Sequence, residues 1–235
     1  MEIKKSGDIA NSTKTTSISI GDSRKGKTYF IGTACDLCRV FIIDAESGLK
    51  SIKDKKFDFV TVNTWKETED ALTWYLTEGY QNYDLLAIDS ITRIQSYLKE
   101  QLKDGPDEHG KNKGNMTMGK YDILAIKLRK VVDVLTKKCP TSVHMTAMAG
   151  EFHDELTGAT KIYPNLQGGF KFDLLGYFDT IMYHNMAVTK DGEQYWCEIA
   201  GSERNCAGTR LAELKATYGK AMPNNYKCIY DAVRA

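Results

Sequence analysis

A glycine-containing segment near the start of the chain has the residue types of a phosphate-binding loop. Residues 21–28 read Gly-Asp-Ser-Arg-Lys-Gly-Lys-Thr, which is the spacing Gly-x-x-x-x-Gly-Lys-Thr. In such a loop the glycines let backbone N–H groups approach phosphate oxygens, the lysine neutralises the β- and γ-phosphates of ATP, and the hydroxyl ligates Mg²⁺. The residues expected to contact the nucleotide are Gly21, Asp22, Ser23, Arg24, Lys25, Gly26, Lys27, Thr28 and Tyr29.

Two apolar segments, each expected to be a strand, end in carboxylates. Residues 84–89 read Asp-Leu-Leu-Ala-Ile-Asp, and residues 39–46 read Arg-Val-Phe-Ile-Ile-Asp-Ala-Glu. Such runs are typical of buried parallel strands, whose carboxyl ends meet where open α/β sheets bind ligands. Beside a phosphate loop, Asp89 would hold magnesium and Glu46 would deprotonate the attacking water. Taken alone, Asp89 or Ser90 fits a helix cap equally well, and Glu46 fits a solvated loop.

The elements that must position these residues alternate between strands and helices. We expect strands at residues 15–20, 39–44, 57–62, 84–89 and 143–148, helices at 29–38, 67–78, 91–102 and 121–138, and shorter strands at 178–186, 194–200 and 226–230. The alternation predicts an α/β fold with a mostly parallel central sheet flanked by helices. The glycine-containing segment then lies between a strand and a helix, which favours a phosphate loop over a basic surface turn.

Two segments without periodicity, residues 103–119 and 150–169, are expected to be long loops. Loops of this length in a compact domain are usually functional or disordered. Both contain basic residues, and the second also contains aromatic ones, a combination that suits contact with a nucleic-acid backbone and with bases. A pair of solvated loops explains the composition equally well. The candidate DNA-binding residues are Lys111, Lys113, Lys120 and Lys161.

Composition and charge narrow the class of protein. The chain has 235 residues, 42% of them hydrophobic, with 32 basic and 31 acidic side chains. These values exclude intrinsic disorder and argue against a protein that coats nucleic acid by bulk charge. We expect one domain at residues 15–235 after a flexible N-terminus at residues 1–14. Because no long apolar run or signal-peptide core is present, a cytoplasmic location is expected.

The cysteines offer one pair with the spacing of metal ligands, Cys35 and Cys38. A structural zinc site needs a second close pair of cysteines or histidines, and the other four cysteines do not supply one. The preferred interpretation is that both are reduced thiols at a helix end packed on the sheet.

The order of the motifs resembles that of RecA-type ATPases. The phosphate loop is followed by Phe-Ile-Ile-Asp-Ala-Glu at residues 41–46 and by Leu-Ala-Ile-Asp-Ser at residues 86–90, where RecA carries Phe-Ile-Asp-Ala-Glu and later a strand ending in Asp-Ser. In its length, and in Pro-Asn-Leu-Gln-Gly at 164–168 and Tyr-Phe-Asp at 177–179, the chain resembles more closely the small phage-encoded single-strand annealing ATPases, the Sak-type recombinases.

The resemblance implies an activity and partners. The chain would be a RecA-like core that binds Mg-ATP and hydrolyses it slowly during DNA recombination or single-strand annealing, in the host cytoplasm if the protein is phage-encoded. Lys27 and Thr28 would hold phosphate and Mg²⁺, Asp89 the metal, and Glu46 the catalytic water. The expected partners are single-stranded DNA, further copies of the chain in a ring or filament, and a single-strand-binding protein.

One departure from the family pattern concerns the γ-phosphate sensor. Met148 lies where the family usually carries a polar residue, and a thioether does not hydrogen-bond strongly to phosphate. His144, Thr146 and Glu151 are the candidate substitutes. The departure weakens the expectation that hydrolysis is tightly coupled to DNA binding, and it leaves open a regulatory nucleotide-binding module without turnover.

The resemblance also suggests that Arg204 or Arg210 acts as a finger on the γ-phosphate of a neighbouring subunit, although surface arginines are more often only solvated. The competing class is an ATPase or small-molecule kinase without a nucleic-acid partner. A kinase should show a lid with clustered arginines, and no such segment is visible in the sequence.

Overall fold

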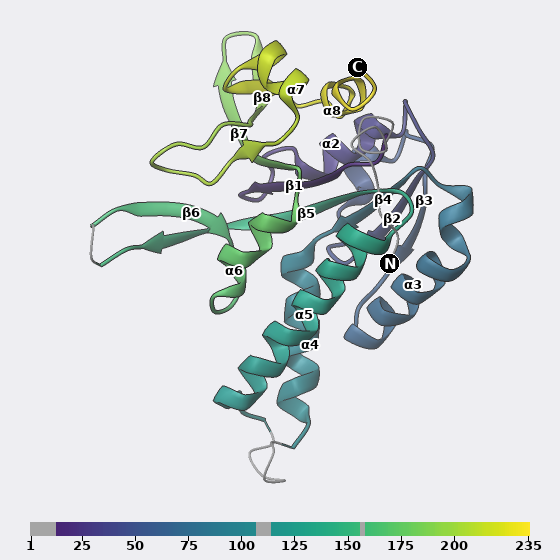
Figure 1. Ribbon diagram of the computed structural model, residues 1–235, viewed down its shortest axis with the longest axis vertical. Coiled ribbons are helices and arrows are strands. Elements are labelled where there is room, and N and C mark those ends of the chain that lie inside the picture. The colour runs from purple at the N-terminus through teal and green to yellow at the C-terminus, as the bar shows by residue number, and fades with distance from the viewer. Residues whose placement is uncertain (1–12, 107–113, 156–157) are drawn as a thin grey trace, which may run out of the picture.

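A mixed, mostly parallel sheet organises the chain (Figure 1). The computed structural model describes residues 13–106, 114–155 and 158–235. Neighbouring strands follow the order β10-β8-β7-β1-β5-β4-β2-β3, with β6 paired to β5 and β9 to β7. The strands are β1 (Thr16–Gly21), β2 (Val40–Asp44), β3 (Asp58–Thr61), β4 (Leu85–Asp89), β5 (Ser142–His153), β6 (Thr160–Pro164), β7 (Thr180–Thr189), β8 (Gly192–Glu198), β9 (Gly208–Thr209) and β10 (Ala221–Pro223).

The parallel strands bring three carboxyl ends to one edge. Strands β1, β5, β4 and β2 run parallel, and every residue of β2 and β4 is buried, which their continuous apolar sequences anticipate. The pairing places Asp44 beside Asp89 and Gly21 beside Met148. The end of β1, where the glycine-containing segment begins, therefore lies at the same edge as the carboxylates that end β2 and β4.

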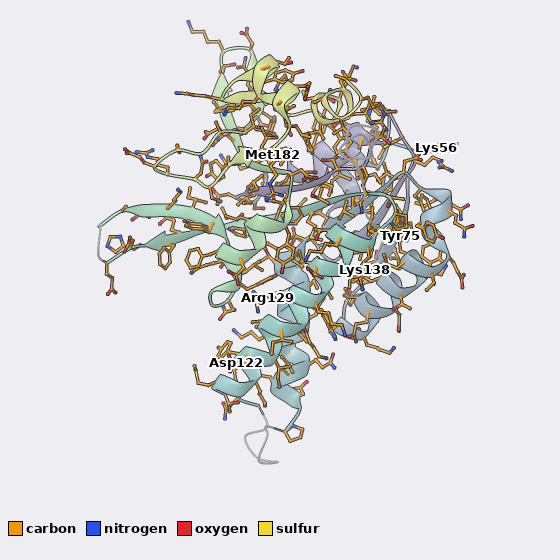
Figure 2. The ribbon with its side chains drawn as sticks, viewed as in Figure 1. Lys56, Tyr75, Asp122, Arg129, Lys138 and Met182 are labelled. Carbon is orange, nitrogen blue, oxygen red and sulfur yellow. The ribbon has the colours of Figure 1, made fainter. Side chains whose placement is uncertain are left out.

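Helices cover both faces of the sheet, and an apolar core lies between the sheet and the helices on each face (Figure 1). On one face α2 (Lys27–Ala34), α7 (Ala212–Tyr218) and α8 (Lys227–Ala232) enclose the core that contains Met182. On the other, α3 (Trp65–Thr77), α4 (Ile91–Asp104) and α5 (Met118–Lys138) enclose the core that contains Tyr75. Both residues are labelled in Figure 2. The shorter helical elements are α6 (Phe170–Asp173), η1 (Leu49–Ile52), η2 (Gly79–Asn82) and η3 (Leu174–Tyr177). The predicted α/β class is confirmed.

Side-chain caps fix where the long helices begin. Thr64 accepts a hydrogen bond from the N–H of Glu67 at the start of α3, and Ser90 accepts one from the N–H of Arg93 at the start of α4. Each cap satisfies a backbone donor that has no partner within its helix. The cap that the sequence suggested at Asp89 or Ser90 is therefore made by Ser90, which leaves the carboxylate of Asp89 for other contacts.

Two predicted segments differ from the structure. The expected loop at residues 150–169 is largely a hairpin, because β5 continues to His153 and pairs antiparallel with β6. Figure 1 shows this hairpin projecting beyond the helical layers. The expected strand at residues 226–230 instead lies at the start of α8, where Tyr226 packs against Phe30 with 5.7 Å between ring centroids. Short apolar runs fit a strand and a helix equally well, so tertiary packing decides.

The boundary of the N-terminal segment and the cytoplasmic location are two expectations that the structure does not test. Most of the predicted N-terminal segment, residues 1–12, lies outside the described residues, so the boundary after residue 14 stays a prediction. Among the described helices, none has the length and apolar character needed to cross a bilayer.

Candidate active site

The segment after β1 turns into helix α2 as a phosphate loop requires. Gly26 is the residue before α2 and has a φ of 83°, a left-handed conformation that favours glycine. A Cβ atom at Gly26 would lie 2.4 Å from Nδ2 of Asn224 and 3.0 Å from Cδ1 of Tyr195. The free N–H groups at the start of α2 and the positive end of its dipole make this turn a site for anions.

Lys27 lies beneath the loop and is only 6% exposed. Its ammonium donates to the carbonyl oxygens of Gly21 and Asp22, both at 2.7 Å, and lies 3.6 Å from the sulfur of Met148. Burial lowers the pKa of Lys27, whereas the charges of Glu46, Asp89 and Asp22 oppose this shift. Among the described residues no carboxylate lies within ion-pair distance of this ammonium, so a phosphate oxygen is a well-matched additional partner.

Thr28 and Asp89 provide the oxygen ligands that Mg²⁺ prefers. The Thr28 hydroxyl donates to Oδ2 of Asp89 at 2.7 Å, and the Thr146 hydroxyl donates to its Oδ1. A Cβ atom at Gly48 would lie 3.7 Å from Oγ1 of Thr28 and 4.0 Å from Oδ2 of Asp89, which is ordinary van der Waals contact, so the turn after β2 lies directly beside these two groups. A hydroxyl and a carboxylate beside a phosphate loop match the ligands of a hard cation, and the residues therefore fit Mg²⁺.

The turn after β2 holds Glu46 at the same edge. Asp44 is buried, and its Oδ1 accepts hydrogen bonds from the N–H groups of Glu46 at 3.1 Å and Gly48 at 3.4 Å. Burial raises the pKa of Asp44, and these backbone hydrogen bonds oppose the shift. The Ser90 hydroxyl donates to Oε1 of Glu46, so the turn and the end of β4 together fix the direction of this carboxylate.

Lys27, Thr28 and Glu46 share a pocket of about 840 Å³. Its lining residues are Ser23, Arg24, Gly26, Lys27, Thr28, Tyr29, Glu46, Gly48, Ser51, Tyr195 and Asn224. The volume falls in the range of small-molecule and cofactor sites. The phosphate loop and Glu46 form one part of the wall, and two tyrosines provide aromatic surface. The structure thus brings together the predicted loop residues, Glu46 and, through Thr28, Asp89.

Met148, at the position where the family usually carries a phosphate sensor, lies near the phosphate loop, whereas its three candidate substitutes lie outside the pocket. Met148 pairs with Gly21 across the sheet and lies close to Lys27. Thr146 is engaged with Asp89, and His144 is fully buried among strand residues. Glu151 lies on the exposed hairpin. None of these substitutes lines the pocket.

The two candidate finger arginines lie away from the phosphate loop of their own chain. Arg204 is in the connection between β8 and β9, beside β6, where its carbonyl accepts the N–H of Ile162 at 2.7 Å. Arg210 lines a separate cavity of about 660 Å³ beside Thr16, at the opposite end of β1 from the loop. Its guanidinium donates to the carbonyl of Gly176 at 3.0 Å. A role for either residue at a γ-phosphate therefore requires a neighbouring subunit.

The expectation that Lys120 contacts DNA is wrong for this conformation. Lys120 is 2% exposed, and its ammonium donates to the carbonyls of Gly105 at 2.8 Å and Asn115 at 2.9 Å, which joins the connection between α4 and α5 to the helix. Lys111 and Lys113 lie outside the described residues. Lys161 is half-buried on β6.

The thiols of Cys35 and Cys38 are held at the end of α2. They donate to the carbonyls of Ile31 and Ala34, each at 3.6 Å. Burial raises the pKa of each thiol to about 11, so both are protonated at neutral pH. Protonated thiols are poor nucleophiles and poor metal ligands, which supports a structural role.

Several site residues were not assigned their roles from the sequence. Thr146 holds Asp89, Asp44 shapes the turn that carries Glu46, and Tyr195 and Asn224 close the pocket. A partial signal exists for Thr146, because alternating polar residues in an otherwise apolar strand indicate a face with hydrogen-bonding partners. Tyr195 and Asn224 follow the phosphate loop by more than 150 residues, and no local pattern brings them to it.

Two buried histidines beneath the loop predict a dependence of stability on pH. Burial lowers the pKa of His144 and of His184 from 6.5 to about 3, and the charge of Lys27 adds to the shift of His184. Between these pH values the unfolded chain binds protons that the folded chain does not, so the free energy of unfolding falls as the pH decreases. For two such groups the loss between pH 6.5 and 5.5 is about 2 kcal/mol.

Urea unfolding at pH 7.5, 6.5, 5.5 and 5.0 measures this loss, and His144→Gln should remove about half of it, since one titrating group is gone. Carboxylates contribute mainly at lower pH because their usual pKa values are near 4. A free energy of unfolding that stays constant down to pH 5.5 would show that the histidines titrate normally in the folded protein.

The chain matches a family model and is similar to solved structures. A family model described as an AAA domain matches residues 13–211. No curated protein matches the chain. Among solved structures, the RadB recombinase is similar at 14% identity with a TM-score of 0.48, covering 78% of this chain and 79% of that one.

Two further solved structures are similar. A KaiC-like protein from the archaeon Pyrococcus horikoshii shows 14% identity and a TM-score of 0.43, over 78% of this chain and 77% of that one. The flagellar accessory protein FlaH from Methanocaldococcus jannaschii shows 9% identity and a TM-score of 0.44, over 83% and 82%. The family match spans most of the chain, including the phosphate loop and the strands ending in Asp44 and Asp89. The chain therefore belongs to the family described as an AAA domain, and its fold is a mixed α/β sheet covered by helices.

Proposed function

We propose that the chain binds ATP with Mg²⁺ and hydrolyses it. The observation that carries this proposal is the convergence of Lys27, Thr28, Asp89 and Glu46 at one sheet edge, three of them in the wall of the same pocket. The four residues come from three segments that are separate in the sequence: the start of α2, the turn after β2 and the end of β4. Asp89 is a buried carboxylate held by two hydroxyls, and Lys27 is a buried ammonium that has no carboxylate partner among the residues the structure describes; together they are matched to a metal–phosphate ligand.

Each residue has a distinct task in this proposal. The loop N–H groups and Lys27 bind the phosphates, while Thr28 and Asp89 hold Mg²⁺, which neutralises charge that develops on the phosphate oxygens. Glu46 accepts a proton from the attacking water, and the Ser90 hydroxyl keeps its carboxylate in place. Tyr29, which is 51% exposed, and Tyr195 offer aromatic surface to the base.

Phosphate release from ATP tests the enzymatic claim directly. Purified protein should release inorganic phosphate from ATP in the presence of Mg²⁺ and stop when the metal is chelated. Calorimetry on the same preparation separates binding from turnover. Binding of Mg-ATP without any release of phosphate would favour a regulatory nucleotide-binding module, and absence of binding would refute the proposal.

We further propose that single-stranded DNA is the partner and that the β5–β6 hairpin contacts it. Phe152, Tyr163 and Phe172 form an aromatic cluster, with ring centroids 4.8 Å apart for Tyr163 and Phe172 and 5.2 Å for Phe152 and Phe172. The Lys171 ammonium lies 4.5 Å from the ring centroid of Phe152. Exposed aromatic faces beside cations are typical of surfaces that bind single strands by stacking and charge.

A second segment adds charge to the same surface. The connection that carries Arg204 lies against β6 through the hydrogen bond from Ile162 and a bridge between Ile162 and Asn205. Arg204 is exposed. Lys171 lies over Phe152, Lys161 pairs with Phe152 across the hairpin, and the backbone of Arg204 lies against β6. We call these three cations and the aromatic cluster the hairpin surface. Annealing or recombination on single strands, as in the phage-encoded Sak-type recombinases, is the role we propose for this surface. The proposal also includes assembly into a ring or filament.

Removing the three cations of the hairpin surface should weaken DNA binding and its salt dependence together. Each phosphate contact on a single strand contributes about 0.7 to the slope of log affinity against log salt, so Lys161→Ala, Lys171→Ala and Arg204→Ala combined should lower that slope by about 2. The matched control replaces three exposed lysines elsewhere, Lys53, Lys56 and Lys220, with alanine. An equal loss in both triple variants would show that the hairpin surface is not the binding site.

A further inference from the structure

A groove separate from the nucleotide pocket lies between α3 and α5, on the face of the sheet that both helices cover (Figure 1). Its volume is about 290 Å³, and it shares no lining residue with the nucleotide pocket or the hairpin surface. Most of its lining is apolar and comes from both helices: Trp65, Leu72, Leu76, Val131, Val134 and Leu135. Apolar lining that is bordered by charged residues is typical of a surface that binds a partner.

The lining residues follow one stripe along each helix. On α3 they include positions 65, 69, 72 and 76, and on α5 they include positions 127, 131 and 134. Residues three or four positions apart lie on the same face of a helix. The stripe from Trp65 to Leu76 is about 16 Å long, or about three helical turns. Two such stripes match the apolar face of a third, amphipathic helix, whose side chains recur at the same intervals.

The α5 side of the groove carries positive charge that no described carboxylate neutralises. Lys127 and Lys130 both line the groove, and neither makes an ion pair within the part of the chain that the structure describes. By contrast, Arg129 on the same helix pairs with Asp173. The α3 side contributes one carboxylate, that of Glu69, so the two lysines leave the groove with a net positive charge. Acidic side chains on an occupant would complement this charge.

Trp65 adds an unsatisfied donor to the same wall. Its side chain is 2% exposed, and its indole Nε1–H makes no hydrogen bond with any described residue. A buried donor without a partner costs about 1–3 kcal/mol. The ammonium of Lys127 lies 5.8 Å from the centroid of the indole ring, but it cannot be the acceptor because an ammonium only donates. Beside Trp65 the groove therefore presents a cation and a donor, and a carboxylate suits both.

We propose that the groove between α3 and α5 is a docking site for an acidic amphipathic helix of a partner protein. Its apolar side chains fill the groove, and its carboxylates lie along α5 against Lys127 and Lys130, which are three residues apart and so face the same side. The site needs neither nucleotide nor DNA, so the inference goes beyond the proposed function and does not depend on it.

The probe is a fluorescein-labelled peptide of about 16 residues, with leucines at helical spacing on one face and glutamates beside them. Its fluorescence anisotropy should report binding to the wild-type protein. Lys127→Glu combined with Lys130→Glu should raise the Kd at least about tenfold, because two attractive charges become repulsive. The matched control, Lys53→Glu combined with Lys56→Glu, reverses two exposed lysines outside the groove and should stay within about twofold.

A charge-swapped peptide, with lysines in place of the glutamates, should bind the Lys127→Glu and Lys130→Glu double variant more tightly than it binds the wild type. If the double variant does not fold, Lys130→Glu alone serves, because Lys130 is exposed. In a protein with Trp74→Phe and Trp196→Phe, Trp65 is the remaining tryptophan, and its emission should shift when the first peptide binds.

Three results would overturn the inference. The first is that the wild-type protein does not bind the acidic peptide, and the second is that both double variants lose affinity equally. The third is that an unlabelled single-stranded oligonucleotide displaces the peptide, which would assign Lys127 and Lys130 to nucleic acid instead of a partner helix.

Discussion

Lys27→Ala should abolish measurable ATP binding. The ammonium of Lys27 is the buried cation beneath the phosphate loop, and alanine removes both its charge and its hydrogen bonds to the carbonyls of Gly21 and Asp22. Loss of one charge-assisted contact costs about 3 kcal/mol, or more than a hundredfold in Kd, and here the loop also loses its internal support. Calorimetric titration with Mg-ATP measures the effect.

Lys56→Ala is the matched control, because Lys56 is an exposed lysine at the periphery of the molecule, labelled in Figure 2. It should bind Mg-ATP like the wild type. Thermal unfolding without nucleotide checks that Lys27→Ala remains folded, since loss of a buried charge and its partners affects stability as well. If folded Lys27→Ala retains wild-type affinity, the assignment of the phosphate loop is refuted.

Glu46→Gln should bind ATP normally and lose turnover. The amide keeps the size of the carboxylate but cannot accept the proton of the attacking water at neutral pH. General-base catalysis typically contributes about 10²–10⁴-fold, so the rate of phosphate release should fall by about that factor while Kd stays within about twofold. Ser90 can still donate to the remaining amide oxygen, which limits the structural disturbance.

Single-turnover measurement of phosphate release, with Kd determined on the same sample, separates the two effects. Glu78→Gln is a suitable control because Glu78 is exposed at the end of α3 and does not line the pocket. A Glu46→Gln protein that turns over at the wild-type rate would remove Glu46 from the catalytic role. The base would then have to be sought elsewhere in the pocket.

The parts of the fold that could be predicted are those that a local sequence pattern determines. Continuous apolar runs identify β2 and β4 because both faces of these strands are buried, and the 3.6-residue spacing identifies α3 and α5. The hairpin of β5 and β6 was missed because β5 leaves the sheet interior at Met148 and its continuation loses the apolar signal. Helix α8 was mistaken for a strand because its six residues span too few turns to show a period.

The site also has residues that local motifs identify and residues that only tertiary contacts bring together. Lys27, Thr28, Glu46 and Asp89 could be found because each belongs to a short motif whose place at a strand end carries the chemistry. Contacts between distant segments set the remaining geometry. The bond from Asn224 to Gly26 links residues 198 positions apart, and sequence spacing holds no information about it. Lys120 shows the converse, because its position in a basic segment suggested an exposed residue, yet backbone carbonyls surround it.

Fluorescence anisotropy of a labelled single-stranded oligonucleotide, with and without Mg-ATP and across a series of salt concentrations, tests the central claim most directly. The DNA-binding ATPase proposed above should bind the oligonucleotide and lose affinity steadily as salt increases. Any change in affinity caused by Mg-ATP should be absent in Lys27→Ala, because this variant should not bind the nucleotide. No binding at low salt, in either nucleotide state, would contradict the DNA-binding account and favour an ATPase or kinase without a nucleic-acid partner.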